Sequence, residues 1–316
     1  MRSVSVVIPV YNSADIFPDL LARLSPVLET MGVPYELIVV DDGSRDESWS
    51  VIVDAAERHD WIRGFNLMRN FGQHNALLCG VRQARHDFIV TMDDDLQHPP
   101  EEIPTLLRKL EEGADVVYGP PLEEQHGLWR DLASAISKTA LRSAMGIGIA
   151  RNVTAFRAFR AQVRDAFVDY RGSFISMDVL LTWGTSRFEF VRVRHDPRLR
   201  GRSHYTFRHL VTHAFNMVTG FSAAPLQLVS LVGFSFTLVG FAFLAFVVGR
   251  YLIQGGAPPG FPFLASQIAI FSGAQLFALG ILGEYLARMH FRTLDKPSYV
   301  VRGDVDGTGE TSEDAG

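Results

Sequence analysis

Two long segments near the C-terminal end contain no charged residue, and they limit what this chain can fold into. They are residues 226–249 and 261–283. A helix of either length, at about 1.5 Å per residue, crosses roughly 30 Å of hydrocarbon. The alternative is a pair of core helices in a soluble domain, but two adjacent uncharged segments favour a two-helix membrane hairpin. The link at residues 255–260 contains three glycines and two prolines, which is typical of a tight turn.

Basic residues on either side of this hairpin predict its orientation. Those ahead of the first segment are Arg187, Arg192, Arg194, Arg198, Arg200, Arg202 and Arg208, and those after the second are Arg288, Arg292 and Lys296. Between the two uncharged segments the only basic residue is Arg250. Because basic residues concentrate on the cytoplasmic side, we predict a multi-pass protein of the cell membrane with its large domain and both termini in the cytoplasm. The single cysteine, Cys79, excludes an internal disulfide and agrees with a reducing compartment.

Residues 1–204 alternate between short apolar runs and segments with helical spacing. The apolar runs are 4–10, 37–40, 62–67, 88–92 and 115–118, and the helical segments include 17–31, 48–58 and 76–85. This alternation predicts an α/β domain with a doubly wound, mostly parallel sheet. A dinucleotide-binding domain is disfavoured because Pro-Val-Tyr-Asn follows the first run in place of a Gly-x-Gly-x-x-Gly turn.

Four regions follow from these patterns. We predict an α/β domain at 1–204, an amphipathic juxtamembrane helix at 205–224, the hairpin at 225–290 and a partly disordered tail at 291–316. The amphipathic helix packs either on the domain core or at the membrane interface, and its position just ahead of the hairpin favours the interface. The tail contains six acidic residues and little to bury, which predicts disorder.

Three consecutive aspartates, Asp93, Asp94 and Asp95, stand directly behind the apolar run 88–92. A buried strand that ends in this way directs carboxylates to the edge of the sheet where α/β proteins bind ligands. Mg²⁺ sites typically combine one or two carboxylates with substrate phosphates. A solvated acidic turn is the alternative. The motif therefore favours a metal-diphosphate site only if neighbouring features support it.

Several ordered motifs supply that support. They are SVVIPVYN at 5–12, VVDDGS at 39–44, RNFG at 69–72 with Ala76, and MDDDLQHPPE at 92–101. Further along the chain are RLRGRSHY at 198–205 and LGILGEYL at 279–286. Together they resemble the family 2 glycosyltransferases, and within them the branch that acts on polyprenyl phosphates, which includes dolichol-phosphate mannose synthase. The resemblance covers roughly residues 3–301.

The resemblance implies a GT-A fold and an inverting transfer of a sugar from a nucleotide-diphosphate donor to a polyprenyl phosphate. The implied nucleotide-sugar contacts are Pro9, Tyr11, Asn12, Asp41, Arg69, Gly72, Ala76, Asp93 and Asp94. Mg²⁺ or Mn²⁺ would be held by Asp93, Asp95 and Gln97, and Asp95 would be catalytic. The expected partners are the donor, the lipid acceptor and the membrane, with no nucleic acid. Small residues in the hairpin, such as Gly233 and Gly240, suit helix packing within or between protomers, so a homo-oligomer is a further prediction.

The acceptor side is less constrained. The acceptor phosphate would meet Arg198, Arg202, Ser203 and His204, although arginines here also satisfy ordinary positive-inside bias. Asp178 occupies the place where members of the fold carry an acidic residue facing the acceptor, so it is either catalytic or a helix-surface aspartate. Three departures from the branch pattern lie on this side: Pro120-Pro121 after Gly119, no Asp at 151–157, and His204 in place of Lys.

Two other functions stay open at the level of sequence. One is the same donor chemistry with another lipid or a glycan as acceptor. A processive glycan synthase would bring more membrane spans and a Gln-x-x-Arg-Trp segment, and the sequence contains neither. The other is a non-catalytic membrane module that binds a nucleotide sugar, against which the intact set of Asp93, Asp95 and Gln97 argues.

Overall fold

The computed structural model describes residues 2–122, 152–172, 175–196, 224–254, 260–294 and 296–307. The amphipathic helix predicted ahead of residue 224 and the acceptor candidates Arg198, Arg202, Ser203 and His204 lie outside these ranges.

One eight-stranded sheet organises the domain, in the order β7-β5-β6-β4-β1-β2-β3-β8. Its strands are β1 (Val4–Val10), β2 (Tyr35–Asp41), β3 (Ile62–Leu67), β4 (Phe88–Thr91), β5 (Val116–Tyr118), β6 (Arg157–Arg160), β7 (Phe188–Phe190) and β8 (Val301–Asp306). The four central strands β4, β1, β2 and β3 are parallel, whereas β6 and β8 run antiparallel to their neighbours. The predicted α/β fold with a mostly parallel sheet is confirmed.

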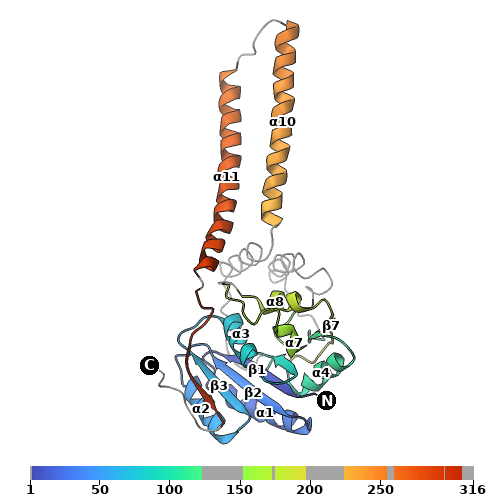
Figure 1. Cartoon of the computed structure of the whole chain (residues 1–316), viewed down its shortest axis with the longest axis vertical. Helices are drawn as coiled ribbons and strands as arrows, with labels where there is room; N and C mark the ends of the chain where they lie inside the picture. The colour runs from blue at the N-terminus through green and yellow to red at the C-terminus, as the bar shows by residue number, and fades with distance from the viewer. Residues whose placement is uncertain are drawn as a thin grey trace.

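Helices cover both faces of this sheet (Figure 1). They are α1 (Phe17–Thr30), α2 (Ser48–Arg58), α3 (Gln73–Gln83), the short η1 (Pro100–Glu102), α4 (Ile103–Glu111), α7 (Ala161–Arg164) and α8 (Met177–Gly184). Alternate residues of β1 separate the two layers. Val4, Val6 and Ile8 pack with α1, α2 and α4, and Val7 packs with α3 and α8. This two-sided burial explains why β1 is a continuous apolar run.

The segment Val301–Asp306 corrects one prediction. It belongs to the tail expected to be partly disordered, but it forms β8, which pairs antiparallel with β3. Val305 is buried in the cluster with α1, α2 and α4, and Val301 packs against the cluster on the other face of the sheet. Asp304 and Asp306 stand opposite Phe65 and Arg63. The unpaired edge of β3 accounts for the strand, because an open edge satisfies its backbone groups by pairing. The segment that follows residue 296 therefore returns to the sheet of the α/β domain.

Two long antiparallel helices, α10 (Ala224–Gln254) and α11 (Phe261–Thr293), extend away from the α/β domain (Figure 1). Within the described residues, α11 contains a segment long and apolar enough to cross a membrane, Ile270–Ala287. The apolar stretch of α10, Leu226–Ala242, is shorter. Large apolar side chains on both helices, such as Phe234 and Leu276, are exposed. One candidate span is thus found, and the second stays a prediction.

Candidate donor site

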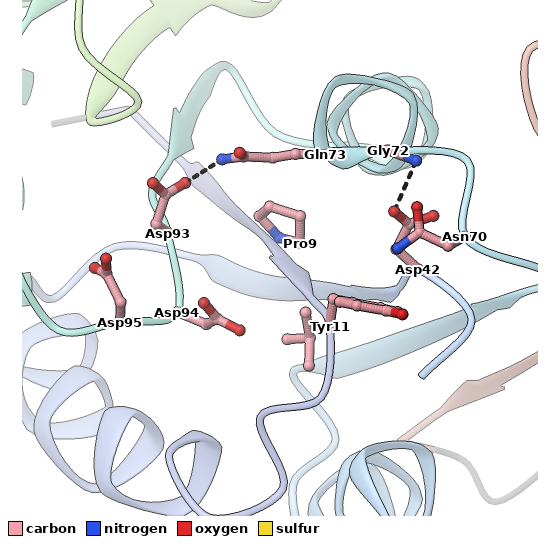
Figure 2. Close-up of a pocket in the computed structure, with 10 residues that line it drawn as sticks. Pro9, Tyr11, Asp42, Asn70, Gly72, Gln73, Asp93, Asp94 and Asp95 are labelled. Carbon is pink, nitrogen blue, oxygen red and sulfur yellow. Dashed lines mark hydrogen bonds between the residues drawn. The ribbon is translucent and has the colours of Figure 1, made fainter. Parts of the chain in front are cut away.

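A cavity of about 490 Å³ opens at the carboxyl ends of β1 and β4 (Figure 2). It is lined by Pro9, Val10, Tyr11, Asp42, Asn70, Gly72, Gln73, Asp93, Asp94 and Asp95. Strand order reverses between β1 and β4, since β2 and β3 follow on one side of β1 and β4 lies on the other. Open α/β sheets bind ligands at such a reversal. The loops after four parallel strands therefore converge on one cavity.

The three aspartates after β4 form one side of this cavity (Figure 2). The Asp94 carboxylate accepts a hydrogen bond from Ser13 Oγ at 2.5 Å, and the Asp93 carboxylate accepts one from Gln73 Nε2 at 2.5 Å. Burial raises the pKa of Asp94, and the Ser13 bond opposes that rise. Asp94 is thereby tied to the loop after β1, and Asp93 to the first residue of α3. The predicted strand-end placement of these carboxylates agrees with the structure.

Leu96 fixes the turn of this loop. It has φ = +58°, a left-handed conformation that is rare for a bulky side chain, and it is buried. The next residue, Gln97, donates its backbone N–H to Asp95 Oδ1 at 3.1 Å. Strain of this kind persists only where the surroundings hold it, and it concentrates at functional sites. Burial of the Leu96 side chain supplies that hold and keeps Asp95 at the cavity wall.

Two of the three predicted metal ligands lie at the cavity wall. Asp93 and Asp95 line the cavity, whereas Gln97 is not among the lining residues. No group of three or more His, Cys, Asp or Glu in the described ranges is arranged to hold a metal ion. Two carboxylates nevertheless fit Mg²⁺ or Mn²⁺, because such ions keep water ligands and take others from substrate phosphates. Asp93 and Asp95 are therefore suitable ligands for a hard divalent cation that is bound together with a diphosphate.

The opposite side of the cavity holds Asp42, which was not among the predicted site residues. Its two carboxylate oxygens accept the backbone N–H groups of Phe71 at 2.7 Å and of Gly72 at 2.8 Å. Burial raises the pKa of Asp42 to about 6, against the effect of those two bonds. The VVDDGS motif marked this turn, but spacing alone did not distinguish Asp42 from Asp41. Asn70 and Gln73 were also missed, although both flank the predicted Gly72 in the sequence.

Asp41 itself is turned away from the lining. It is 1% exposed, and its carboxylate accepts hydrogen bonds from the backbone N–H and the hydroxyl of Ser44. Gly43, which stands between Asp42 and Ser44, has φ = +67°. A Cβ at this position would lie 2.4 Å from the Arg69 carbonyl carbon. Only glycine allows this approach of the two loops. Asp41 thus shapes the cavity edge, and its contact with a nucleotide stays a prediction.

The remaining predicted donor residues divide into two groups. Pro9, Tyr11 and Gly72 line the cavity. Asn12, Arg69 and Ala76 do not. Asn12 Oδ1 accepts the Arg45 N–H at 2.8 Å, the Arg69 guanidinium lies 4.1 Å from the Phe71 ring centroid, and Ala76 is buried in α3. These three support the loops around the cavity.

Asp178 lies in the first turn of α8 and is only 8% exposed, so it is not a helix-surface aspartate. It forms an ion pair with the buried Arg157, and it accepts the Tyr118 hydroxyl at 3.2 Å. Arg157 Nε also donates to Thr91 Oγ1 at 3.0 Å, at the end of β4. Burial alone would lower the pKa of Arg157, but the negative charges of Asp178 and Asp93, with the Tyr118 contact, outweigh it and raise that pKa. Sequence reasoning missed Arg157 because nothing in its local pattern predicts a buried charge.

Sequence comparison with known proteins identifies the family of this chain. Residues 5–167 match the family model described as glycosyl transferase family 2. An undecaprenyl-phosphate 4-deoxy-4-formamido-L-arabinose transferase of Shewanella sediminis is 37% identical over 303 residues, which cover 95% of this chain and 91% of the relative.

Solved structures share the fold at lower identity. A mannosyl-3-phosphoglycerate synthase from Rubrobacter xylanophilus has a TM-score of 0.51 at 18% identity, covering 83% of this chain and 79% of its own. A glucosyl-3-phosphoglycerate synthase from Mycobacterium tuberculosis, in complex with Mn²⁺, uridine diphosphate and phosphoglyceric acid, has a TM-score of 0.51 at 17% identity, covering 69% and 76%. The expected GT-A-like fold is confirmed. The chain belongs to glycosyl transferase family 2.

Proposed function

We propose that this protein transfers a sugar from a nucleoside-diphosphate donor to undecaprenyl phosphate or a similar polyprenyl phosphate at the cytoplasmic face of the membrane, with inversion at the sugar. The observation that carries the proposal is the aspartate-lined cavity at the β1–β4 reversal, in a chain that aligns over 95% of its length with a transferase named for that acceptor. The relative's name also gives a candidate sugar, 4-deoxy-4-formamido-L-arabinose.

The donor half rests on the carboxylates. Asp93 and Asp95 would hold Mg²⁺ or Mn²⁺, with Gln97 as a further contributor, and the Mycobacterium tuberculosis enzyme of this fold carries Mn²⁺ with uridine diphosphate. A bound divalent cation offsets the negative charge that builds on the leaving diphosphate. Tyr11, Asp42 and Asn70 would hold the nucleoside side of the donor, since they stand across the cavity from the aspartates (Figure 2).

The acceptor half needs little proton chemistry. A phosphate monoester has a second pKa of about 6, so near neutral pH it is mostly a dianion and already a nucleophile. Positioning and charge neutralisation then dominate. Arg198, Arg202, Ser203 and His204 would supply the neutralisation. Asp178 would orient the acceptor, because its ion pair with Arg157 and the Tyr118 bond fix the direction of its carboxylate.

The membrane half rests on α10 and α11. Both would span the bilayer as a hairpin, although within the described residues only Ile270–Ala287 meets the length and hydropathy expected of a span by itself. The arginines ahead of α10 and the basic residues after α11 would keep the domain and both termini in the cytoplasm.

A donor screen tests the proposal. The full chain, purified in detergent with Mn²⁺, is incubated with undecaprenyl phosphate and a panel of nucleotide sugars, including a nucleotide-linked 4-deoxy-4-formamido-L-arabinose. We expect one donor to give a lipid-linked sugar detected by mass. Nucleotide binding without transfer to any lipid would support a non-catalytic module, and transfer to a glycan alone would replace the acceptor.

A further inference from the structure

The chain that leaves the membrane helix α11 returns to the rim of the donor cavity. Before β8 begins, the Val300 carbonyl accepts the Met68 N–H at 2.9 Å, and the ring of Tyr299 lies 5.5 Å from the Arg82 guanidinium of α3. β8 then pairs with β3, whose last residue, Leu67, stands opposite Val301. The post-membrane segment is therefore anchored beside the loop 68–70, which leads to Asn70 at the cavity wall.

This anchoring sets Arg302 beside the same loop. Arg302 Nη2 donates to the Met68 carbonyl at 3.1 Å, and the side chain is otherwise exposed at the surface. The Arg302 charge also reaches the Asp41 carboxylate, where it opposes the burial that raises the pKa of Asp41. A guanidinium has five N–H donors, and the Met68 carbonyl takes one of them. Arg302 is thus held beside the loop that leads to the cavity, and its other N–H groups can donate hydrogen bonds to a ligand.

The charges around the cavity indicate what the Arg302 N–H groups would bind. Four carboxylates line it, from Asp42, Asp93, Asp94 and Asp95, and the lining residues include no lysine or arginine. A nucleoside diphosphate is itself an anion, and one divalent cation at Asp93 and Asp95 leaves the nucleoside side of the cavity without positive charge. Among the described residues, Arg69, whose guanidinium stacks on Phe71, and Arg302 lie next to that side. Arginine suits this position because its planar fork matches phosphate oxygens and stacks on planar rings.

We propose that Arg302 is a donor-binding residue that contacts the nucleoside diphosphate from a strand placed after the membrane helices. The inference rests on the proposed function for the identity of the donor site. Donor affinity would then depend on the segment that follows the anchor, so the membrane hairpin and the nucleotide site are parts of one binding unit.

The test compares Arg302→Met with Arg58→Met in the full chain. Arg58 is a suitable control because it lies on the surface of α2 and pairs with Asp54 at 3.8 Å, with its side chain 74% exposed. Equilibrium binding of uridine, guanosine, cytidine and adenosine diphosphates in Mn²⁺ first identifies the nucleotide that the wild type prefers. For it, we expect Arg302→Met to weaken binding about tenfold, as for the loss of one charge-assisted contact, Arg302→Lys to recover part of the loss, and Arg58→Met to stay within about twofold.

Two further readouts separate binding from folding. The donor KM should rise with the dissociation constant while the acceptor KM and the melting temperature stay at wild-type values, because the side chain is exposed. Wild-type affinity in Arg302→Met overturns the inference. A lower melting temperature together with equal rises in the donor and acceptor KM also overturns it, because that result marks a structural role. If Arg302→Met fails to fold, Arg302→Lys is measured in its place. If the wild type binds none of the four diphosphates, the proposed function fails as well.

Discussion

The buried ion pair between Arg157 and Asp178 allows structural and catalytic roles to be separated. The two side chains are 2% and 11% exposed. Arg157→Met keeps the volume of the side chain and removes its charge. Among the described contacts, Asp178 is then left buried with only the Tyr118 hydroxyl, and Thr91 Oγ1 loses its donor. Removing one member of a buried pair costs about 3–5 kcal/mol, because the other charge has no compensation.

That cost converts to a large change in melting temperature. A domain of this size shifts by about 2–4 °C per kcal/mol, so Arg157→Met should lower the melting temperature by about 6–20 °C. Unfolding is followed by tryptophan fluorescence in detergent, since Trp183 lies on α8 with Asp178. The double variant Arg157→Met with Asp178→Leu should recover most of the stability, because apolar replacement of a whole buried pair is close to neutral.

Activity then distinguishes the roles. If Asp178 orients the acceptor, the double variant regains stability but transfers no sugar. A stable and active double variant would refute a functional role for Asp178, and a melting temperature within about 2 °C of wild type for Arg157→Met would refute the ion-pair reasoning itself.

Three other perturbations probe the donor cavity. Asp95→Asn, or removal of metal with a chelator, should lower kcat by at least about a hundredfold, measured with and without added Mn²⁺, because several kcal/mol of charge stabilisation is lost. Gly43→Ala should destabilise the domain well beyond Gly32→Ala in thermal melts. Both have positive φ, but only at Gly43 would a Cβ meet backbone, 2.4 Å from Arg69, and at Gly32 nothing lies within 4 Å. The Asp42 carboxyl has a folded pKa of about 6, raised from 3.8, so its contribution to stability is full below pH 4 and is lost as pH rises through about 6. The stability of wild type relative to Asp42→Asn should therefore fall between about pH 4 and 6.5 and level off above that range, and a flat difference throughout would contradict this burial effect.

The strands that build the donor site follow from local pattern. The predicted runs at 4–10 and 62–67 coincide with β1 and β3, because buried parallel strands are continuous apolar runs. β8 could not be predicted in the same way. Its sequence VRGDVD has two acids and one glycine, and only the open edge of β3, more than 230 residues earlier in the chain, makes it a strand. Pairing at such separation has no local signature.

The two halves of the site differ for the same reason. Asp93, Asp94 and Asp95 face one cavity because a single strand end presents them, so their spacing predicted their placement. Arg157 and Asp178 come from β6 and α8, and their meeting depends on the antiparallel insertion of β6 beside β4. That insertion aligns Arg157 with Thr91, two residues before Asp93, and Arg157 bonds both the Thr91 hydroxyl and Asp178. The strand end that carries the metal candidates is therefore linked through one buried guanidinium to the carboxylate on α8. A change at Arg157 should thus affect donor and acceptor steps together, whereas a change at Ser13, which bonds Asp94 alone among the three aspartates in the described contacts, should affect the donor step.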